Sequence, residues 1–402
     1  MKIVKVETIR NSALPNVLWV QLHSEDGLIG LGETYYLPSA VEAVIHDLLA
    51  SFVLGRSDSE IESIWDQAFS YCNFFGYAGA EMRALSALDI ALWDVLGQRT
   101  GQPIYTLLGG MVRDTIPVYN TCVDTELHDD AEAFVSRPAE LARDLLSEGI
   151  KAMKIWPWDR FAPRLKSTAA LGPAGYTAMG PSGSFISARD LDSGLNIVKA
   201  IRDAVGKDIE IIIEGHSRWD LNCAIRIGKV LEPFDILWME DMMKPDSVID
   251  LSRLVTETRV PQSVSERLFT RYAYRQVLEA RAAHIIMPDL IWTGGITEGR
   301  KIAILADTFH LPIAPHDCTG LVALFANLHL CASSTNAMLL ECVRGFYRGW
   351  YKWVYTNNIE IAEGHASFPT MPGLGTRLKP DFLADPRTSI RVSVPGDASV
   401  IV

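Results

Sequence analysis

The sequence Ile209-Glu-Ile-Ile-Ile-Glu-Gly-His216 has the pattern of a short apolar strand that ends in a carboxylate, and the same unit recurs along the chain. Comparable apolar runs end at Glu240, Glu266, Asp289, His316 and Glu341. Successive ends are 23 to 27 residues apart, which is the length of one strand–helix unit. A polar residue at the carboxyl end of each parallel strand is typical of a (β/α)8 barrel with its site at one mouth. We therefore expect an α/β protein with a barrel.

The residues before this barrel show other periodicities. Alternating apolar residues predict strands at 2–9, 17–22 and 28–31, and a period near 3.6 predicts helices at 41–52, 61–71 and 79–97. We expect Gly97 to end the last of these helices as its C-cap. Strands followed by helices make an α+β unit.

The predicted organisation follows from these shifts in pattern. We expect an N-terminal α+β unit over 1–115, a barrel over 116–356, and a C-terminal segment over 357–402 that packs back on the first unit. A stretch rich in Gly, Pro, Ser and Ala, residues 157–192, interrupts the rhythm of the barrel. A connection of that length is usually either a lid or an assembly element, and both alternatives stay open.

Composition limits the classes of partner. The chain has 402 residues with 37 basic and 49 acidic side chains, so its formal charge is −12 and its field repels nucleic acid and anionic lipid. Six scattered cysteines without a CxxC pair fit reduced thiols, and no run of about 18 apolar residues occurs. We expect a cytoplasmic protein that acts on a small molecule and binds neither nucleic acid nor membrane.

Three of the strand-end carboxylates predict a metal site. Glu214, Glu240 and Glu266 end consecutive strands, and three carboxylates that converge on one point repel each other unless a cation lies between them. Oxygen ligands without Cys or His favour Mg²⁺, with Mn²⁺ as the second choice. The alternative is that one or more of these glutamates forms salt bridges to barrel lysines.

The remaining strand ends carry groups that can move protons. Asp289 and His316 end neighbouring strands, where the carboxylate can fix the tautomer of the imidazole and raise its basicity. The period of two puts Lys154 and Trp156 on one side of their strand, facing the barrel mouth, and puts His216 beside Glu214. A plain structural tie is the alternative for the His–Asp pair.

Several motifs together resemble the enolase superfamily, and within it the mandelate racemase-like subgroup that contains the acid-sugar dehydratases. The motifs are Gly109-Gly110-Met-Val-Arg113-Asp114, Lys154, Trp238-Met-Glu240-Asp241, Ser265-Glu266-Arg267-Leu268, Met287-Pro288-Asp289, Gly294-Gly295-Ile-Thr297-Glu298, Pro315-His316-Asp317 and Pro372-Gly-Leu-Gly375. The resemblance covers nearly the whole chain. It implies a modified (β/α)7β barrel under an α+β capping domain, and assembly as a dimer or an octamer.

The resemblance also implies a reaction. Members abstract the proton α to a carboxylate while Mg²⁺ stabilises the enediolate. Carried over, Glu214, Glu240 and Glu266 correspond to the metal ligands, with Glu214 in place of a more usual Asp. Asp289 and His316 correspond to the base dyad.

Departures from the family pattern reduce the number of reaction types that the resemblance allows. Trp156 stands where racemases have a second lysine, and an indole cannot take a proton, so His316 is left as the base. Lys154 is expected to balance the substrate carboxylate or to donate a proton, and Glu341 to lie near the substrate or to close the barrel with a salt bridge. His216 matches the general acid that sugar-acid dehydratases often place two residues after the first ligand.

The resemblance therefore favours dehydration of a sugar acid, an aldonate or an aldarate, to a 2-keto-3-deoxy acid. Trp156 is expected to contact that substrate at the barrel mouth. A one-base epimerase or a sugar-acid lactone cycloisomerase would share the metal and the first proton transfer, and a barrel without catalysis is a further alternative.

Overall fold

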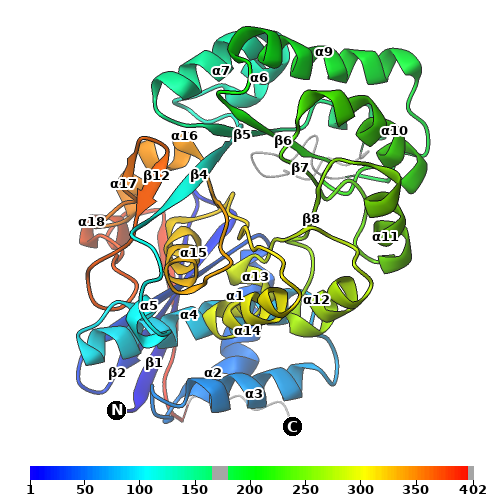
Figure 1. The fold of residues 1–402 in the computed structure, drawn as a ribbon. Coiled ribbons are helices and arrows are strands. Elements are labelled where there is room, and N and C mark those ends of the chain that lie inside the picture. Colours follow the sequence, from blue (N-terminus) through cyan, green and yellow to red (C-terminus); the bar gives the residue numbers. More distant parts are fainter. Residues whose placement is uncertain (165–179, 397–402) are drawn as a thin grey trace.

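The structure is a computed structural model and describes residues 1–164 and 180–396. Two sheets organise the chain, an antiparallel one built from both ends of the sequence and a parallel one that closes into a barrel (Figure 1). Within the described residues, no helix is both long and apolar enough to cross a membrane. Residues 165–179, part of the connection predicted to be a lid or an assembly element, lie outside the described residues.

The antiparallel sheet has the strand order β13-β1-β2-β3. Its strands are β1 (Ile3–Asn11), β2 (Val17–Ser24), β3 (Ile29–Tyr35) and β13 (Thr388–Ser393). The C-terminal strand pairs with the first one, in the register Val6 to Ser393, so the tail completes the N-terminal sheet as predicted. The accompanying helices are α1 (Pro38–Val44), which continues through a π-helical turn (Ile45–Leu49) into α2 (Ala50–Val53), then α3 (Ile61–Cys72) and α4 (Ala80–Thr100).

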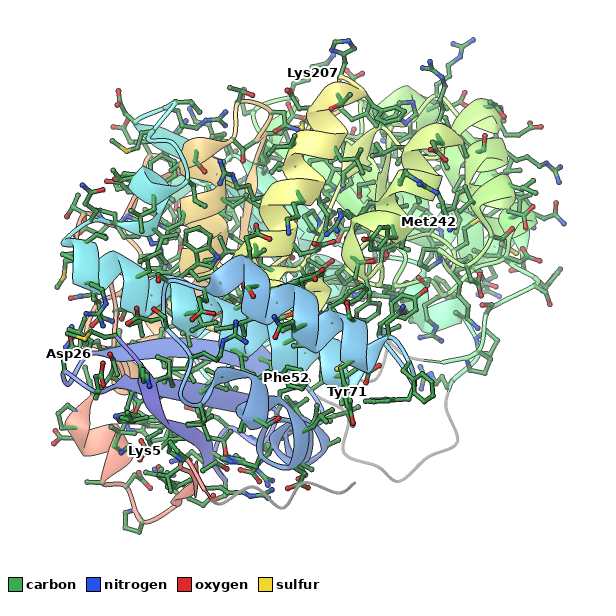
Figure 2. The ribbon with its side chains drawn as sticks, turned by 90° about the horizontal axis from the view of Figure 1, so that it is seen from below. Lys5, Asp26, Phe52, Tyr71, Lys207 and Met242 are labelled. Atoms are coloured by element: carbon green, nitrogen blue, oxygen red, sulfur yellow. The ribbon has the colours of Figure 1, made fainter. Side chains whose placement is uncertain are left out.

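Helix α4 lies between the antiparallel sheet and the barrel. Figure 2 shows it crossing the molecule between the sheet, marked by Lys5 and Asp26, and the barrel, marked by Lys207. The approach to β3 is close, because a Cβ added at Gly32 would lie 1.9 Å from the carbonyl oxygen of Ala87 in α4. Glycine is therefore required at this contact.

The predicted end of α4 was wrong. The helix continues past Gly97 to Thr100, and its C-cap is Gly101 with a left-handed φ of 68°. Gly97 lies inside the helix, at the point where the C-terminal segment crosses it. A Cβ at Gly97 would lie 2.5 Å from the Cα of Gly373, so the position requires glycine. The glycine marks a close backbone approach rather than a helix end.

The barrel consists of parallel strands in sequence order. They are β4 (Thr115–Thr121), β5 (Ala152–Ile155), β6 (Glu210–Glu214), β7 (Trp238–Glu240), β8 (Gln262–Val264), β9 (Ile285–Ile286) and β10 (Leu340–Cys342). The seventh position of the ring is reduced to a bridge at Ile313, which joins Ile286 to Ala337. β10 then pairs with β4, with Glu341 opposite Tyr119, and closes the ring.

Helices surround the barrel on the outside (Figure 1). The described α-helices that follow α4 are α5 (Ile104–Leu107), α6 (Asp130–Ser136), α7 (Pro138–Ser147), α9 (Ala188–Val205), α10 (Leu221–Leu231), α11 (Val248–Glu257), α12 (Thr270–Glu279), α13 (Leu290–Thr293), α14 (Gly295–Thr308), α15 (Leu321–Ser333), α16 (Arg344–Arg348), α17 (Tyr351–Val354) and α18 (Pro380–Leu383). Of these, α13 packs on α4 and β3, and α18 places Phe382 against Trp19. A short hairpin, β11 (Ile361–Ala362) and β12 (His365–Ser367), extends the sheet beside β4. The predicted α/β fold with a capping domain is confirmed.

Candidate active site

The barrel interior forms the floor of the site. A separate buried cluster fills it, made of Tyr119, Ala152, Ile212, Trp238, Ile285, Met287 and Ala314. Alternate residues of a strand share a face, so the next inward side chain is two positions further along. That step leads from Ala152 to Lys154, from Ile212 to Glu214 and from Trp238 to Glu240. It also leads from Ala314 to His316, so the strand period alone gathers these polar groups at one mouth.

A cavity of about 300 Å³ opens above this floor. It is lined by Tyr36, Arg83, Thr121, Val123, Lys154, Trp156, Glu214, His216, Glu266, Arg267, Trp292, His316, Cys318, Thr319 and Glu341. Seven of the nine residues predicted for the site are in this lining, and Glu240 and Asp289 lie behind it, fully buried. Hollows of about 590 and 820 Å³ exist elsewhere, but neither is lined by these strand-end groups. Chemistry rather than size therefore identifies the site.

Lys154 ties the strand-end carboxylates together. Its Nζ lies 2.7 Å from Glu341 Oε1 and 3.5 Å from Glu214 Oε2, and it also forms an ion pair with Glu240. Glu214 and Glu240 are opposite each other in the β6–β7 register. The sequence alternative of salt bridges to a barrel lysine is therefore present for two of the three glutamates.

These charges shift one another's ionisation. Burial raises the pKa of Glu214 and of Glu240, although the Lys154 ammonium opposes the shift. Burial lowers the pKa of Lys154, but the carboxylates of Glu240 and Glu341 outweigh it and hold that pKa well above its usual range. The site is thus a group of buried acids around one buried ammonium.

The glutamates fit a hard cation in their donor chemistry. In the described part of the chain, no three or more His, Cys, Asp or Glu side chains are already arranged around one metal-sized point. Glu214 and Glu240 lie opposite each other in the β6–β7 register, and the Lys154 ammonium is the positive charge that lies against both carboxylates. The buried Oε2 of Glu266 has no hydrogen-bond partner among the residues that the structure describes. A divalent cation bound by these three carboxylates would give that oxygen a partner.

His316 and Asp289 form a buried pair. His316 Nδ1 lies 2.7 Å from Asp289 Oδ2, and the other oxygen of Asp289 accepts from the backbone N–H of Ile291 at 2.9 Å. Burial lowers the pKa of His316, but Glu341 and Asp289 raise it to about 10. Because Nδ1 is held by Asp289, Nε2 is the ring nitrogen available to the cavity that His316 lines.

His216 is held on three sides. Its backbone N–H donates to Glu214 Oε1 at 2.6 Å, and its Nδ1 lies 2.6 Å from Asp159 Oδ2. The Trp156 ring meets the imidazole edge-on with 5.3 Å between centroids. A left-handed φ of 45° turns the chain at His216 directly after β6. Trp156 therefore forms a wall that orients the imidazole.

Both carboxylate oxygens of Glu341 have hydrogen-bond or ion-pair partners within the protein. Its Oε2 accepts from the Tyr119 hydroxyl at 3.0 Å and from the Asp317 N–H at 2.9 Å, and Oε1 accepts from Lys154 and the Thr121 hydroxyl. Burial alone would raise its pKa, but Lys154 and His316 lower it to about 2. These contacts favour the barrel-closing salt bridge over direct contact with a substrate.

Sequence reasoning missed residues that reach the site from outside the barrel strands. Arg83 comes from α4, lies 4.1 Å above the Trp292 ring and donates to the Tyr35 carbonyl at 2.7 Å. Asp159 comes from the turn after β5. Neither position lies in a strand-end pattern, and only the fold brings them to the mouth.

Comparisons with known proteins agree with this geometry. The family described as mandelate racemase / muconate lactonizing enzyme, N-terminal domain, matches residues 6–109, and the family described as enolase C-terminal domain-like matches residues 137–382. A D-galactonate dehydratase from Pectobacterium atrosepticum is 31% identical over 392 residues, covering 96% of this chain and 94% of that protein.

Solved structures are similar over nearly the full length. An enolase of the mandelate racemase subgroup from Agrobacterium tumefaciens is 40% identical with a TM-score of 0.86, covering 98% of this chain and 99% of that one. A putative dehydratase from Salmonella enterica serovar Typhimurium is 27% identical with a TM-score of 0.86, covering 97% and 99%. The chain belongs to the enolase superfamily, with a mandelate racemase / muconate lactonizing enzyme N-terminal domain, and it is an enzyme.

Proposed function

We propose that this enzyme is a Mg²⁺-dependent dehydratase of a sugar acid, either an aldonate or an aldarate. The observation that carries the proposal is the pair of histidines, His316 and His216, that line one cavity beside strand-end glutamates. A β-elimination needs a base for the proton at C2 and an acid for the hydroxyl at C3. The similarity to a D-galactonate dehydratase supports the same reaction class.

The protein groups divide the reaction between them. His316 Nε2 takes the proton from C2, and Asp289 holds the resulting imidazolium through Nδ1. His216 gives a proton to the C3 hydroxyl as the C3–O bond breaks, so that water leaves. The enol that remains tautomerises to a 2-keto-3-deoxy acid.

Glu214, Glu240 and Glu266 would hold the Mg²⁺, with Mn²⁺ as a second choice. The bound ion would offset the negative charge that develops on the substrate carboxylate after proton abstraction. Lys154 adds a second positive charge beside that carboxylate. Glu341 keeps the Lys154 ammonium in place through its 2.7 Å contact, and Trp156 forms the adjoining wall.

The test is incubation of the enzyme with Mg²⁺ and a panel of aldonic and aldaric acids in D₂O, followed by NMR and mass spectrometry. A 2-keto-3-deoxy product that is lost in Glu240→Gln supports the proposal and names the substrate. Deuterium at C2 without loss of water supports the epimerase instead, and interconversion of lactones supports the cycloisomerase. Absence of product and of exchange across the panel would overturn the proposal.

A further inference from the structure

A second His–Asp pair lies at the cavity, and the proposed mechanism assigns a role to its histidine but none to its aspartate. His216 Nδ1 lies 2.6 Å from Asp159 Oδ2, and His316 Nδ1 lies 2.7 Å from Asp289 Oδ2. In both pairs the aspartate side chain is fully buried and the histidine is 14% or 10% exposed, respectively. The two contacts use the same atoms and nearly the same distance.

The two pairs also occupy equivalent places in the barrel. Asp159 follows β5 and His216 follows β6, the second and third strands of the ring. Asp289 follows β9 and His316 follows the bridge at Ile313, which take the sixth and seventh positions. Positions four apart in a ring of eight are opposite each other, so the pairs face each other across the mouth. Each aspartate comes from the strand before its histidine.

We propose that Asp159 is a positioning residue for proton donation by His216, so that the site works with two opposed His–Asp pairs. This inference rests on the proposed dehydration. Asp159 keeps the proton of the imidazole on Nδ1, which leaves Nε2 as the atom that exchanges a proton with the leaving hydroxyl. The role parallels that of Asp289 at the base.

The surroundings of Asp159 support a directed contact. Its Oδ1 is buried and has no hydrogen-bond partner among the described residues, so the bond to His216 is the polar contact that orients the carboxylate. Burial raises the pKa of Asp159, while His216, Arg218 and Arg267 oppose that shift. Arg267 also donates to the His216 carbonyl at 2.9 Å, which fixes the backbone of the histidine independently of Asp159.

Removal of the carboxylate should separate the two halves of the reaction. In Asp159→Asn, the amide cannot accept from Nδ1–H as a carboxylate does, so we expect elimination to slow by roughly 10²-fold in kcat with KM nearly unchanged. Exchange of the C2 proton in D₂O should persist, because His316 is untouched. The matched variant Asp289→Asn should instead lose exchange and elimination together. A purely structural tie would slow both processes equally in Asp159→Asn and would overturn the proposal.

A double substitution tests whether Asp159 acts through His216. With His216→Asn already present, Asp159→Asn should have no further effect on elimination, because residues that act as a unit are not additive. Asp159→Glu, which keeps the carboxylate, should recover part of the activity lost in Asp159→Asn. A further slowing of similar size in the double variant would contradict a role through His216.

A tautomer measurement separates this inference from the proposed function. Long-range ¹H–¹⁵N correlation of the histidine rings in the Mg²⁺-loaded wild-type enzyme should show His216 protonated at Nδ1, whether or not any sugar acid is turned over. His216 protonated only at Nε2 would overturn the inference even if dehydration is found. The wild-type spectrum requires no variant to fold.

Discussion

The molecule buries carboxylates in two regions, and their partners differ. At the barrel mouth, Glu240 and Glu341 are held by the Lys154 ammonium. At the capping seam, which we define by Asp94, Asp89 and Glu33, the partners are neutral donors. Asp94 accepts from the N–H of Leu31 at 2.8 Å and of Leu374 at 2.7 Å, and Asp89 accepts from the N–H of Thr297 at 2.9 Å.

This difference distinguishes the seam acids, which we interpret as structural, from the mouth acids, to which the proposed function assigns roles. Burial raises the pKa of Asp94 to about 6 and of Asp89 to about 7, and backbone donors only partly oppose it. At the mouth, burial acts in the same direction, but His316 and Arg267 hold the pKa of Glu266 below its usual range. Burial alone therefore does not mark an active site. Buried acids whose ionisation is balanced by neighbouring charged side chains are the better candidates for one.

The largest effect should follow from a change at the mouth that leaves the seam intact. We expect His316→Asn to lower kcat/KM by about 10³-fold, because the proposed base is removed while Asp289 can still bond to the amide. Turnover of the sugar acid identified for the wild type measures the effect. The midpoint of thermal unfolding serves as the control and should change little. Activity within a few-fold of wild type would show that another group takes the C2 proton.

The converse change breaks the seam. Asp94→Ala leaves the N–H groups of Leu31 and Leu374 without their acceptor, which should lower the free energy of unfolding by about 4 kcal/mol. Urea unfolding measures this loss, and Asp94→Asn should lose less because its amide oxygen still accepts one bond. The folded Asp94→Ala protein should keep its kcat. Loss of activity with unchanged stability would contradict the separation between seam and mouth.

A buried histidine beside the seam, His329, should make stability depend on pH in the mildly acidic range. The N–H of Tyr105 donates to His329 Nδ1 at 3.3 Å, so Nε2 carries the proton that it donates to the Leu374 carbonyl at 3.0 Å. Burial lowers the pKa of His329 to about 4. The unfolded chain takes up the proton first, near pH 6.5, so stability is fully present above that pH and is lost as the pH falls towards 4.

We expect this group to contribute about 3 kcal/mol to that loss. His329→Gln cannot titrate, so the difference in unfolding free energy between wild type and variant should shrink by about this amount from pH 6.5 to pH 4. Denaturant unfolding at a series of pH values measures it. A constant difference across the range would show that His329 takes up its proton at the same pH in the folded and the unfolded state.

Much of the mouth could be predicted from the sequence because the strand period and the barrel direction place side chains without further information. Glu214, Glu240 and His316 each follow an interior residue by two positions, and the spacing of the units was visible in the chain. The roles of these residues stay predictions. The apolar run that ends at His316 was expected to form a strand, but among the described residues it contributes a bridge at Ile313 and no longer ladder.

The rest depended on long-range contacts that no local pattern records. Gly97 could not be distinguished from a helix end until the C-terminal segment was seen to cross it at Gly373. Arg83 lines the cavity from α4, and Asp159 contacts His216 from a turn, so neither residue stands at a strand end. The 157–192 connection was expected to be loop, yet α9 already begins at Ala188, with Ser187 as its N-cap.

A titration with Mg²⁺ should give the smallest change in stability, and it compares the mouth with the seam directly. A ligand that binds only the folded state stabilises it, by about 2.7 kcal/mol at a concentration 100 times its dissociation constant. We expect Mg²⁺ to raise the unfolding midpoint of the wild type and to raise that of Asp94→Ala equally, because the seam holds no proposed ligand. Glu240→Gln removes one proposed ligand and should respond weakly or not at all. An equal response in Glu240→Gln would show that Glu240 is not a ligand of the bound ion.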